Sequence, residues 1–291
     1  MASVTESSHQ EGWWETSDAV RLYAQWWKPS GAAKAIVCLV HGGCEHSGRY
    51  AHLANRLASS GYLVAAIDLR GHGRSPGRRV FIRSFAEYLA DVHCLLSQAA
   101  KQAPGRPVFL LGHSLGGLIA TLFVIAERPA IAGLVLSGPF LELGQGISKP
   151  AVMLARIMGR LFPKLTLTKA LDTTAVSRNP EVVSAYAKDP LVHHGGIPLG
   201  TGVEVMKAIV TKNARMAEIR VPLLVFHGTA DRLAAVDGSK QLYSRASSAD
   251  KTLRLCEGLF HEVFNEPERD TLLDELVKWL DGHMDNPGPS T

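Results

Sequence analysis

The sequence predicts an α/β protein with a doubly wound, mostly parallel sheet and a mainly helical cap inserted after the sixth strand. Three observations predict this class. Short apolar runs alternate with segments of helical periodicity along most of the 291 residues. The runs are apolar at nearly every position, as central parallel strands covered on both faces are. Between residues 140 and 220 the alternation fails, and helical segments and prolines replace it.

The first half of the chain supplies most of the sheet. Strands are expected in the alternating segment 21–29 and in the apolar runs 36–40, 62–68, 107–112 and 131–138. Apolar residues spaced three and four apart predict helices between them, at 49–61, 81–102 and 115–128. Because each helix returns the chain to the same end of the sheet, consecutive strands are expected to run parallel.

The second half returns to the sheet after the cap. A strand and loop are predicted at 221–231 and a strand at 251–258, with helices at 238–247 and 270–283. The chain thus divides into core residues 13–139, a cap at 140–220 and core residues 221–283. We expect disordered tails at 1–12 and 284–291, the latter rich in proline and glycine. A cap inserted here should lie over the carboxyl ends of the strands, where α/β proteins place their sites.

Composition narrows the class of protein. An apolar content of 46% is enough for a sizeable core, and the net charge of +4 is small. The densest basic segment, "RGHGRSPGRR", is short and has no interleaved aromatic residues, so we expect no nucleic-acid partner. The four cysteines are far apart and most lie in apolar runs, which predicts buried free thiols in a reducing compartment. Oligomeric state leaves no signal in the sequence.

The sequence predicts a cytoplasmic protein, at most peripheral to a membrane. No basic start followed by an apolar core indicates a signal peptide. Residues 107–126 carry no charge and approach the length of a membrane span, but glycines and a His-Ser pair break the middle of this segment. A buried strand, a turn and a buried helix explain it better than a transmembrane helix.

The segment "LLGHSLGG" places Ser114 between glycines at the junction of a predicted strand and a predicted helix. This G-x-S-x-G pattern is the nucleophile elbow, in which a strained turn exposes a serine hydroxyl and its neighbours must be small. A purely structural turn is the alternative. The partners that a nucleophilic serine needs follow in the expected order of acid and then histidine. Asp231 follows one late strand and His261 follows the next, and Asp237 is a second candidate for the acid.

Acyl transfer also needs backbone N–H donors for the oxyanion. The residue after the nucleophile, Leu115, provides one, and Gly43 in the loop after strand 36–40 is the choice for the other. His113 is next to Ser114 and must point elsewhere, so it cannot be the base. No histidine, cysteine or acid falls at metal-ligand spacing nearby, so no metal and no cofactor are expected.

The segments "HGGCEHSGRY", "RGHGRS", "PVFLLGHSLGG", "SRNPEVVSAYAKDPL", "GTADRL" and "EGLFHEVFNE" resemble the monoacylglycerol lipases of the α/β-hydrolase superfamily. The similarity extends from about Trp13 to His283. The loop "HGGCEHSGRY" and the cap segment "SRN…Y…DPL" are more specific than the elbow, which many α/β hydrolases share. The resemblance implies the α/β-hydrolase fold, the triad Ser114, Asp231 and His261, and oxyanion donors at Gly43 and Leu115.

The resemblance also implies a small polar pocket for the glycerol end of the substrate. The matching residues are Glu45, Arg49, His113 and Tyr186. A structural ion pair between Glu45 and Arg49 that braces the oxyanion loop is an equally good and compatible interpretation. Two departures stand out. Ala234 occupies a position where eukaryotic members often carry a cysteine, so thiol-directed inhibition there should be absent, and Cys44 replaces a smaller residue, which leaves the exact alcohol open.

One predicted cap helix has a basic face. Arg156, Arg160 and Lys164 recur every fourth residue, and apolar residues cover much of the rest of this helix. Such a helix can contact a membrane or micelle surface transiently. The alternative is a helix packed over the acyl channel with its charges in water, and a mixture of the two is expected.

Together these patterns predict a serine hydrolase that cleaves carboxylic esters with an apolar acyl chain through an acyl-enzyme on Ser114. Monoacylglycerol is the expected substrate. A lysophospholipase and a broad short-chain or aromatic carboxylesterase are the alternatives among enzymes. A non-catalytic binding protein with the same fold is a remote alternative, because such proteins usually lack a member of the triad.

Overall fold

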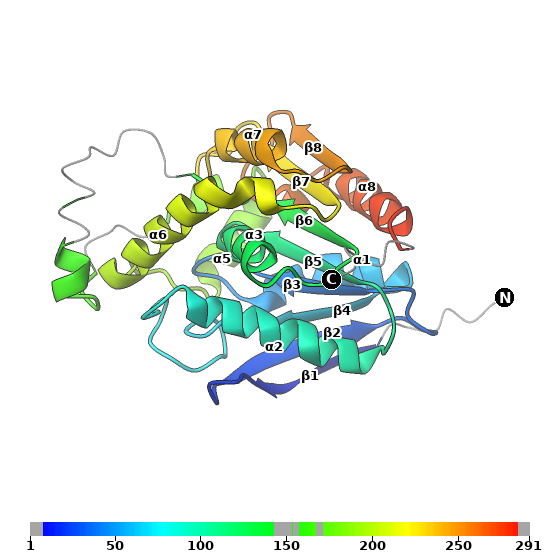
Figure 1. Cartoon of the computed structure of the whole chain (residues 1–291), viewed down its shortest axis with the longest axis horizontal. Helices are drawn as coiled ribbons and strands as arrows, with labels where there is room; N and C mark the ends of the chain where they lie inside the picture. Colours follow the sequence, from blue (N-terminus) through cyan, green and yellow to red (C-terminus); the bar gives the residue numbers. More distant parts are fainter. Residues whose placement is uncertain (1–7, 143–152, 154–156, 167–170, 285–291) are drawn as a thin grey trace.

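The computed structural model describes residues 8–142, 153, 157–166 and 171–284. Within them, eight strands form one sheet in the order β1-β2-β4-β3-β5-β6-β7-β8 (Figure 1). β1 and β2 are antiparallel to their neighbours, and the strands from β4 to β8 pair in parallel. The strands are β1 (Ser8–Glu15), β2 (Arg21–Lys28), β3 (Ile36–Val40), β4 (Leu63–Ile67), β5 (Val108–His113), β6 (Gly133–Ser137), β7 (Leu223–Gly228) and β8 (Lys251–Cys256). The predicted α/β class is confirmed.

Helices cover both faces of the sheet (Figure 1). α2 (Ala86–Gln102), α3 (Leu115–Glu127) and α7 (Val236–Arg245) pack on one face, and α1 (Ala51–Ser59) and α8 (Arg269–Asp281) pack on the other. The side chains of β3 alternate between these two layers. Ile36, Cys38 and Val40 belong to the first core, and Val37 and Leu39 belong to the second. This two-sided burial explains why the central strands are apolar at every position.

The prediction of a disordered tail at 1–12 is wrong for residues 8–12, which lie in β1. This edge strand is mostly exposed, so its sequence lacks the apolar alternation that predicts a strand. Pairing with β2 and ring stacking hold it in place: the Trp14 and Trp26 rings stack with centroids 5.4 Å apart. At the other end of the chain, Met284 packs against the core, and residues 285–291 lie outside the described part.

The helix predicted from residue 81 begins at Ala86 instead. Two backbone N–H groups of the preceding segment donate to side chains of the cap helix α6 (Leu199–Arg215). Ile82 N–H donates to Thr201 Oγ1 at 3.2 Å, and Phe85 N–H donates to the Glu204 carboxylate at 3.1 Å. Tertiary contacts thus replace the first helical turns that periodicity alone suggests.

The described part of the cap contains α5 (Pro180–Lys188), α6 and a short helix at 157–161. Of the predicted basic face, Arg156 lies outside the described residues. Arg160 is exposed on the short helix, but Lys164 lies beyond its end. Pro163 disfavours helical backbone at the residue before it, so the helix stops before Lys164 can join the same face. The expectation of a three-residue helical face is therefore wrong at Lys164.

All four cysteines, Cys38, Cys44, Cys94 and Cys256, are buried and free. Within the described part of the chain, no helix is both long and apolar enough to cross a membrane.

Lys212, on α6, is fully buried, and its ammonium group has no hydrogen-bond partner among the described residues. Burial lowers its pKa to about 8, against the opposing charge of Glu142. Lys212→Met is expected to raise the free energy of unfolding by about 1–3 kcal/mol, because it removes a buried unpaired charge. Thermal melting of the two proteins measures this difference.

The gain should depend on pH. The unfolded lysine keeps a pKa near 10.5, so the penalty of the native lysine is complete below pH 8 and disappears as the pH rises from 8 to 10.5. The two melting temperatures should therefore converge over that range. Lys207→Met, on an exposed lysine of the same helix, is the control and should change stability by less than about 0.5 kcal/mol. An unchanged or lower melting temperature for Lys212→Met at pH 7 would contradict the prediction.

Candidate active site

Ser114 lies at a sharp turn between β5 and α3, at the carboxyl end of the parallel strands. Its backbone has φ 51° and ψ −117°, values that residues with a side chain seldom adopt. The chain around it is tightly packed. A Cβ atom on Gly112 would lie 2.4 Å from the Gly116 oxygen, and one on Gly116 would lie 2.2 Å from the Val40 oxygen. Both positions therefore require glycine, as expected for a nucleophile elbow.

Asp231 and His261 come together from two separate loops. Asp231 follows β7, His261 follows β8, and His261 Nδ1 lies 2.7 Å from Asp231 Oδ2. Burial alone would lower the pKa of His261, but the hydrogen bond and the charge of Asp231 raise it. The other oxygen of Asp231 accepts the backbone N–H groups of Leu233 and Ala234 at 2.7 and 2.9 Å. With Nδ1 bound to the carboxylate, Nε2 of His261 is left to accept a proton.

The segment after β6 links Ser114 to His261. Phe140 N–H donates to the Ser114 backbone oxygen at 2.9 Å. Two residues earlier, a Cβ on Gly138 would lie 3.2 Å from His261 Nδ1. The ring of His113, beside the serine, is 4.7 Å from the His261 ring between centroids. The fold therefore brings the three residues of the predicted triad to one edge of the sheet.

The loop after β3 holds the predicted oxyanion donor. Gly42 N–H donates to Glu45 Oε1 at 2.6 Å, and the Cys44 oxygen accepts His193 N–H from the cap at 2.7 Å. Neither Gly43 N–H nor Leu115 N–H has an acceptor among the described residues. The two residues are adjacent, because a Cβ on Gly43 would lie 3.5 Å from Leu115 Cδ2. Two free donors on fixed backbone suit an oxyanion.

A buried ion pair joins this loop to the His261 loop. Arg49 donates to Glu45 and makes a bidentate contact with Glu262 at 2.6 and 2.7 Å. All three side chains are less than a tenth exposed. Burial opposes the charged forms, but the two carboxylates raise the pKa of Arg49, and Arg49 holds the pKa of Glu45 below its usual value. This geometry matches the structural brace predicted from the sequence.

Arg49→Met is expected to lower the free energy of unfolding by about 3–5 kcal/mol, because it leaves two buried carboxylates without a cation. Urea unfolding measures the loss. Adding Glu262→Gln should recover part of it by removing one of the uncompensated charges. Arg56→Met, at an exposed Arg56–Asp274 pair, is the control and should cost at most about 1 kcal/mol. Equal losses for the two single variants would contradict the brace.

The other residues predicted to hold the glycerol end lie beside this pair. The guanidinium carbon of Arg49 is 4.5 Å from the centroid of the Tyr186 ring, and Tyr186 is buried. His113 is also buried, with Nδ1 3.3 Å from Ser137 Oγ. Burial, together with the charge of His261, lowers the pKa of His113 to about 4. Its imidazole is therefore neutral at pH 7.

Two residues of this site were missed by the sequence reasoning. Glu262 follows His261 directly, and its backbone N–H donates to the cap residue Val176 at 2.8 Å. His227 lies at the end of β7, and its Nε2 is 3.2 Å from Asp231 Oδ2. Its place at the end of β7, four residues before Asp231, was the available signal. Asp237, the second candidate acid, instead forms a surface pair with Lys240 at 3.1 Å.

Within the described part of the chain, no three His, Cys, Asp or Glu side chains group closely enough to hold a metal ion.

Comparison with known proteins identifies the family. The family model described as serine aminopeptidase, S33 matches residues 31–268. A monoacylglycerol lipase of Mycolicibacterium smegmatis is 40% identical over 284 residues, covering 98% of this chain and all of the relative. The chain belongs to the monoacylglycerol lipase family. Within this α/β-hydrolase family it is a carboxylic ester hydrolase.

Further members support the assignment. The human monoglyceride lipase is 37% identical over 268 residues, covering 91% of this chain and 88% of its own length. The crystal structure of the Paleococcus ferrophilus monoacylglycerol lipase superposes with a TM-score of 0.82 at 34% identity, covering 90% of this chain and 99% of that one. The resemblance of this chain to the monoacylglycerol lipase family is therefore confirmed over most of its length.

Proposed function

We propose that this chain hydrolyses monoacylglycerols to a fatty acid and glycerol through an acyl-enzyme on Ser114. The observation that carries the proposal is the 2.7 Å contact between His261 and Asp231 beside a serine on a strained turn. This is the arrangement of a nucleophile, a general base and the group that orients the base. The names of the similar lipases supply the substrate class.

In this mechanism His261 Nε2 takes the hydroxyl proton as Ser114 Oγ attacks the ester carbonyl carbon. The Gly43 and Leu115 N–H groups hold the oxyanion, and Asp231 stabilises the imidazolium. The bond to glycerol breaks when His261 returns the proton to the leaving oxygen. Water, deprotonated by the same imidazole, then attacks the acyl carbon. Ser114 leaves, regains its proton and frees the fatty acid.

The glycerol end is proposed to lie against Glu45, Arg49, His113 and Tyr186. Arg49 and Glu45 are already paired, so their role toward glycerol is through the shape and charge of a rigid wall.

The cap contributes exposed apolar side chains, with Leu161 64% and Phe162 55% exposed. We propose that these side chains, with Arg160 and Lys164, touch a membrane or micelle transiently from the cytoplasmic side.

The pH dependence of the reaction follows from the base. His261 must be neutral to accept the serine proton, and Asp231 raises its pKa above 6.5. We expect kcat/KM to fall on the acid side with a midpoint above 6.5. A pH profile with a soluble ester measures it, and melting temperatures across the same range exclude unfolding as the cause. A midpoint below 6.5 would contradict the proposed pairing in the free enzyme.

Fatty-acid release from 1-monoacylglycerols of increasing chain length tests the proposal. Lysophosphatidylcholine, a diacylglycerol and a p-nitrophenyl ester are the competing substrates. Monoacylglycerol turnover well above the others supports the proposal. Preference for lysophosphatidylcholine would make the protein a lysophospholipase. Fast p-nitrophenyl ester cleavage with little monoacylglycerol turnover would make it a broad carboxylesterase. Either result would change the proposed substrate but not the proposed mechanism. No turnover of any ester by folded protein would overturn both.

A further inference from the structure

A basic groove lies on the core beside the cap, outside the site described above. It has a cavity volume of about 720 Å³ and is lined by the turn before β2, the loop between β4 and α2, and Lys164 of the cap. In the described part of the chain, four exposed cations line it: Arg21, Arg78, Arg83 and Lys164. Arg78 belongs to "RGHGRSPGRR", the densest basic part of the sequence, and Arg83 lies four residues after the end of this segment. The proposed hydrolysis uses none of them.

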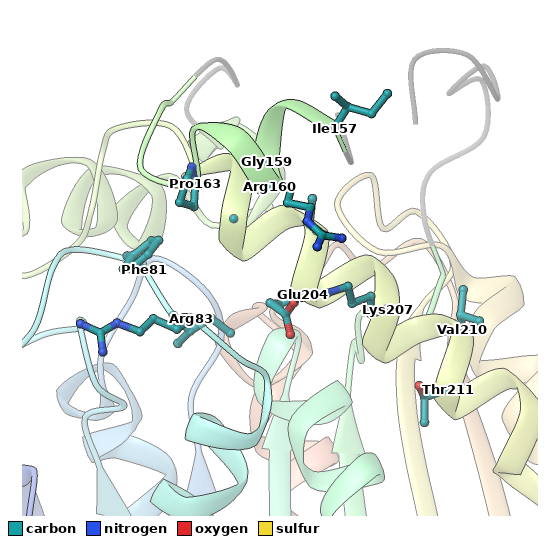
Figure 2. Close-up of a pocket in the computed structure, with 13 residues that line it drawn as sticks. Phe81, Arg83, Ile157, Gly159, Arg160, Pro163, Glu204, Lys207, Val210 and Thr211 are labelled. Atoms are coloured by element: carbon teal, nitrogen blue, oxygen red, sulfur yellow. Dashed lines mark hydrogen bonds and ion pairs between the residues drawn. The ribbon is translucent and has the colours of Figure 1, made fainter. Parts of the chain in front are cut away.

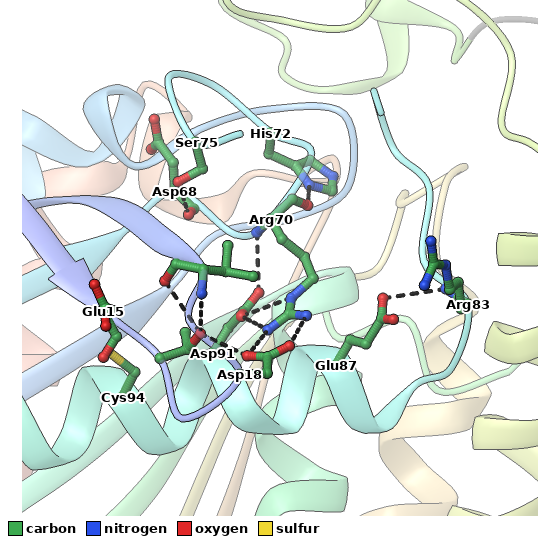
Figure 3. Close-up of polar contacts among 12 residues, drawn as sticks. Glu15, Asp18, Asp68, Arg70, His72, Ser75, Arg83, Glu87, Asp91 and Cys94 are labelled. Atoms are coloured by element: carbon green, nitrogen blue, oxygen red, sulfur yellow. Dashed lines mark hydrogen bonds and ion pairs between the residues drawn. The ribbon is translucent and has the colours of Figure 1, made fainter. Parts of the chain in front are cut away.

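The charge of the groove is largely uncompensated. Arg70 in its wall is neutralised, because it forms ion pairs with Asp18 and Asp91 at 2.7 and 2.6 Å (Figure 3). Among the described residues, no carboxylate lies within 4.0 Å of the other four cations. Glu87 is the sole acid among the described residues of the lining, and it accepts the backbone N–H of Arg83 at 3.2 Å. A multiply charged anion is thus the ligand that this groove fits.

Exposed apolar side chains adjoin the charges. Leu165 is 40% exposed and directly follows Lys164, and Leu161 and Phe162 lie just before it. A second cavity of about 900 Å³ shares Phe81 and Arg83 with the groove and lies between the short cap helix and α6 (Figure 2). Figure 2 places Arg160 and Ile157 on the cap side of this second cavity. Cations and apolar groups therefore form one continuous surface.

We propose that this groove binds the phosphate headgroup of an anionic phospholipid while the apolar cap residues contact the acyl region of the same membrane. A lipid surface offers partners for both parts, whereas a nucleic acid backbone offers none for the apolar side chains. The inference rests on the proposed function, in which the substrate comes from a lipid phase. It adds the core residues Arg21, Arg78 and Arg83 to the two cations of the cap, and so strengthens the selectivity for negatively charged membranes.

Flotation with vesicles tests the proposal. The vesicles are phosphatidylcholine alone, or phosphatidylcholine with about a third phosphatidylglycerol, each at low and high salt. The wild type should bind the anionic vesicles more tightly, and high salt should weaken this binding. Arg78→Gln with Arg83→Gln should weaken it about 25-fold, from about fivefold for each cation removed. The matched control, Lys101→Gln with Arg106→Gln, removes two exposed cations at the opposite end of α2.

Equal binding to both kinds of vesicle, or equal losses for the two double variants, would overturn the proposal.

A second measurement, with inorganic phosphate, distinguishes binding of a membrane headgroup from binding of a free anion. If phosphate raises the melting temperature of the wild type but not of the groove variant, and anionic vesicles do not bind, the groove is a small-anion site and the proposal is wrong. Turnover of a soluble p-nitrophenyl ester without vesicles should be unchanged in the groove variant. If the wild type itself does not turn over the soluble ester, that result counts against the proposed function and not against the groove.

Discussion

Ser114→Ala is expected to lower kcat/KM by at least about four orders of magnitude, which corresponds to about 5.5 kcal/mol of transition-state stabilisation. The alanine keeps the Cβ atom and removes only the oxygen that is proposed to form the acyl-enzyme. The other parts of the site, including the His261–Asp231 contact and the two free N–H groups, do not depend on that oxygen. Steady-state turnover of a monoacylglycerol and of a p-nitrophenyl ester measures the loss.

Two further variants separate chemistry from folding. Ser114→Gly should be equally inactive but about 1 kcal/mol more stable than Ser114→Ala, since glycine adopts the φ of 51° without strain. Ser97→Ala, at an exposed serine on α2, should leave the activity unchanged. Retention of a tenth or more of the activity by folded Ser114→Ala would rule out this serine as the nucleophile.

Asp231→Asn is expected to lower kcat by about four orders of magnitude, as loss of the orienting carboxylate does in serine hydrolases. The local geometry explains why the amide cannot substitute. Asp231 Oδ1 accepts two backbone N–H groups, so the asparagine oxygen must take that position and its NH₂ group must face His261. An amide donor at Nδ1 forces the proton of the imidazole onto Nε2, and the base is lost.

The pH profile gives an independent readout for Asp231. Because this carboxylate raises the pKa of His261, the acid midpoint of the residual activity should fall below that of the wild type. Asp237→Asn is the matched control, since it changes the other candidate acid, which forms a surface ion pair with Lys240. If Asp237→Asn loses activity and Asp231→Asn keeps it, the assignment of the acid is wrong.

Local patterns were sufficient for the centre of this fold. The parallel strands are apolar at every position because helices cover both faces, and that burial leaves a clear mark on the sequence. The elbow is equally legible, because close backbone contacts exclude side chains at Gly112 and Gly116. The positions of Asp231 and His261 followed from the order of strands and loops, since each residue lies in the loop that follows a strand.

Features that depend on distant contacts could not be predicted in the same way. β1 is exposed and held by pairing with β2, so its residues carry no apolar period. The segment before α2 is periodic but is bound to Thr201 and Glu204 of the cap. Glu262 pairs with Arg49 across 213 positions of the chain, and no local spacing reveals such a partner. The two side chains meet only because the fold places the loop after β3 beside the loop after β8.

Two backbone hydrogen bonds join described residues of the cap to the loops of the candidate site. Val176 holds the loop of His261, and His193 holds the loop of Gly43, both through backbone hydrogen bonds. When the cap of a relative is grafted onto this chain, the crossover points therefore decide whether these two backbone contacts are kept. Exchanging residues 143–170 would leave both backbone contacts to the native chain, whereas a graft that also replaces 172–194 would exchange the two cap residues that make these contacts. New substrate ranges are best sought with the first kind of graft.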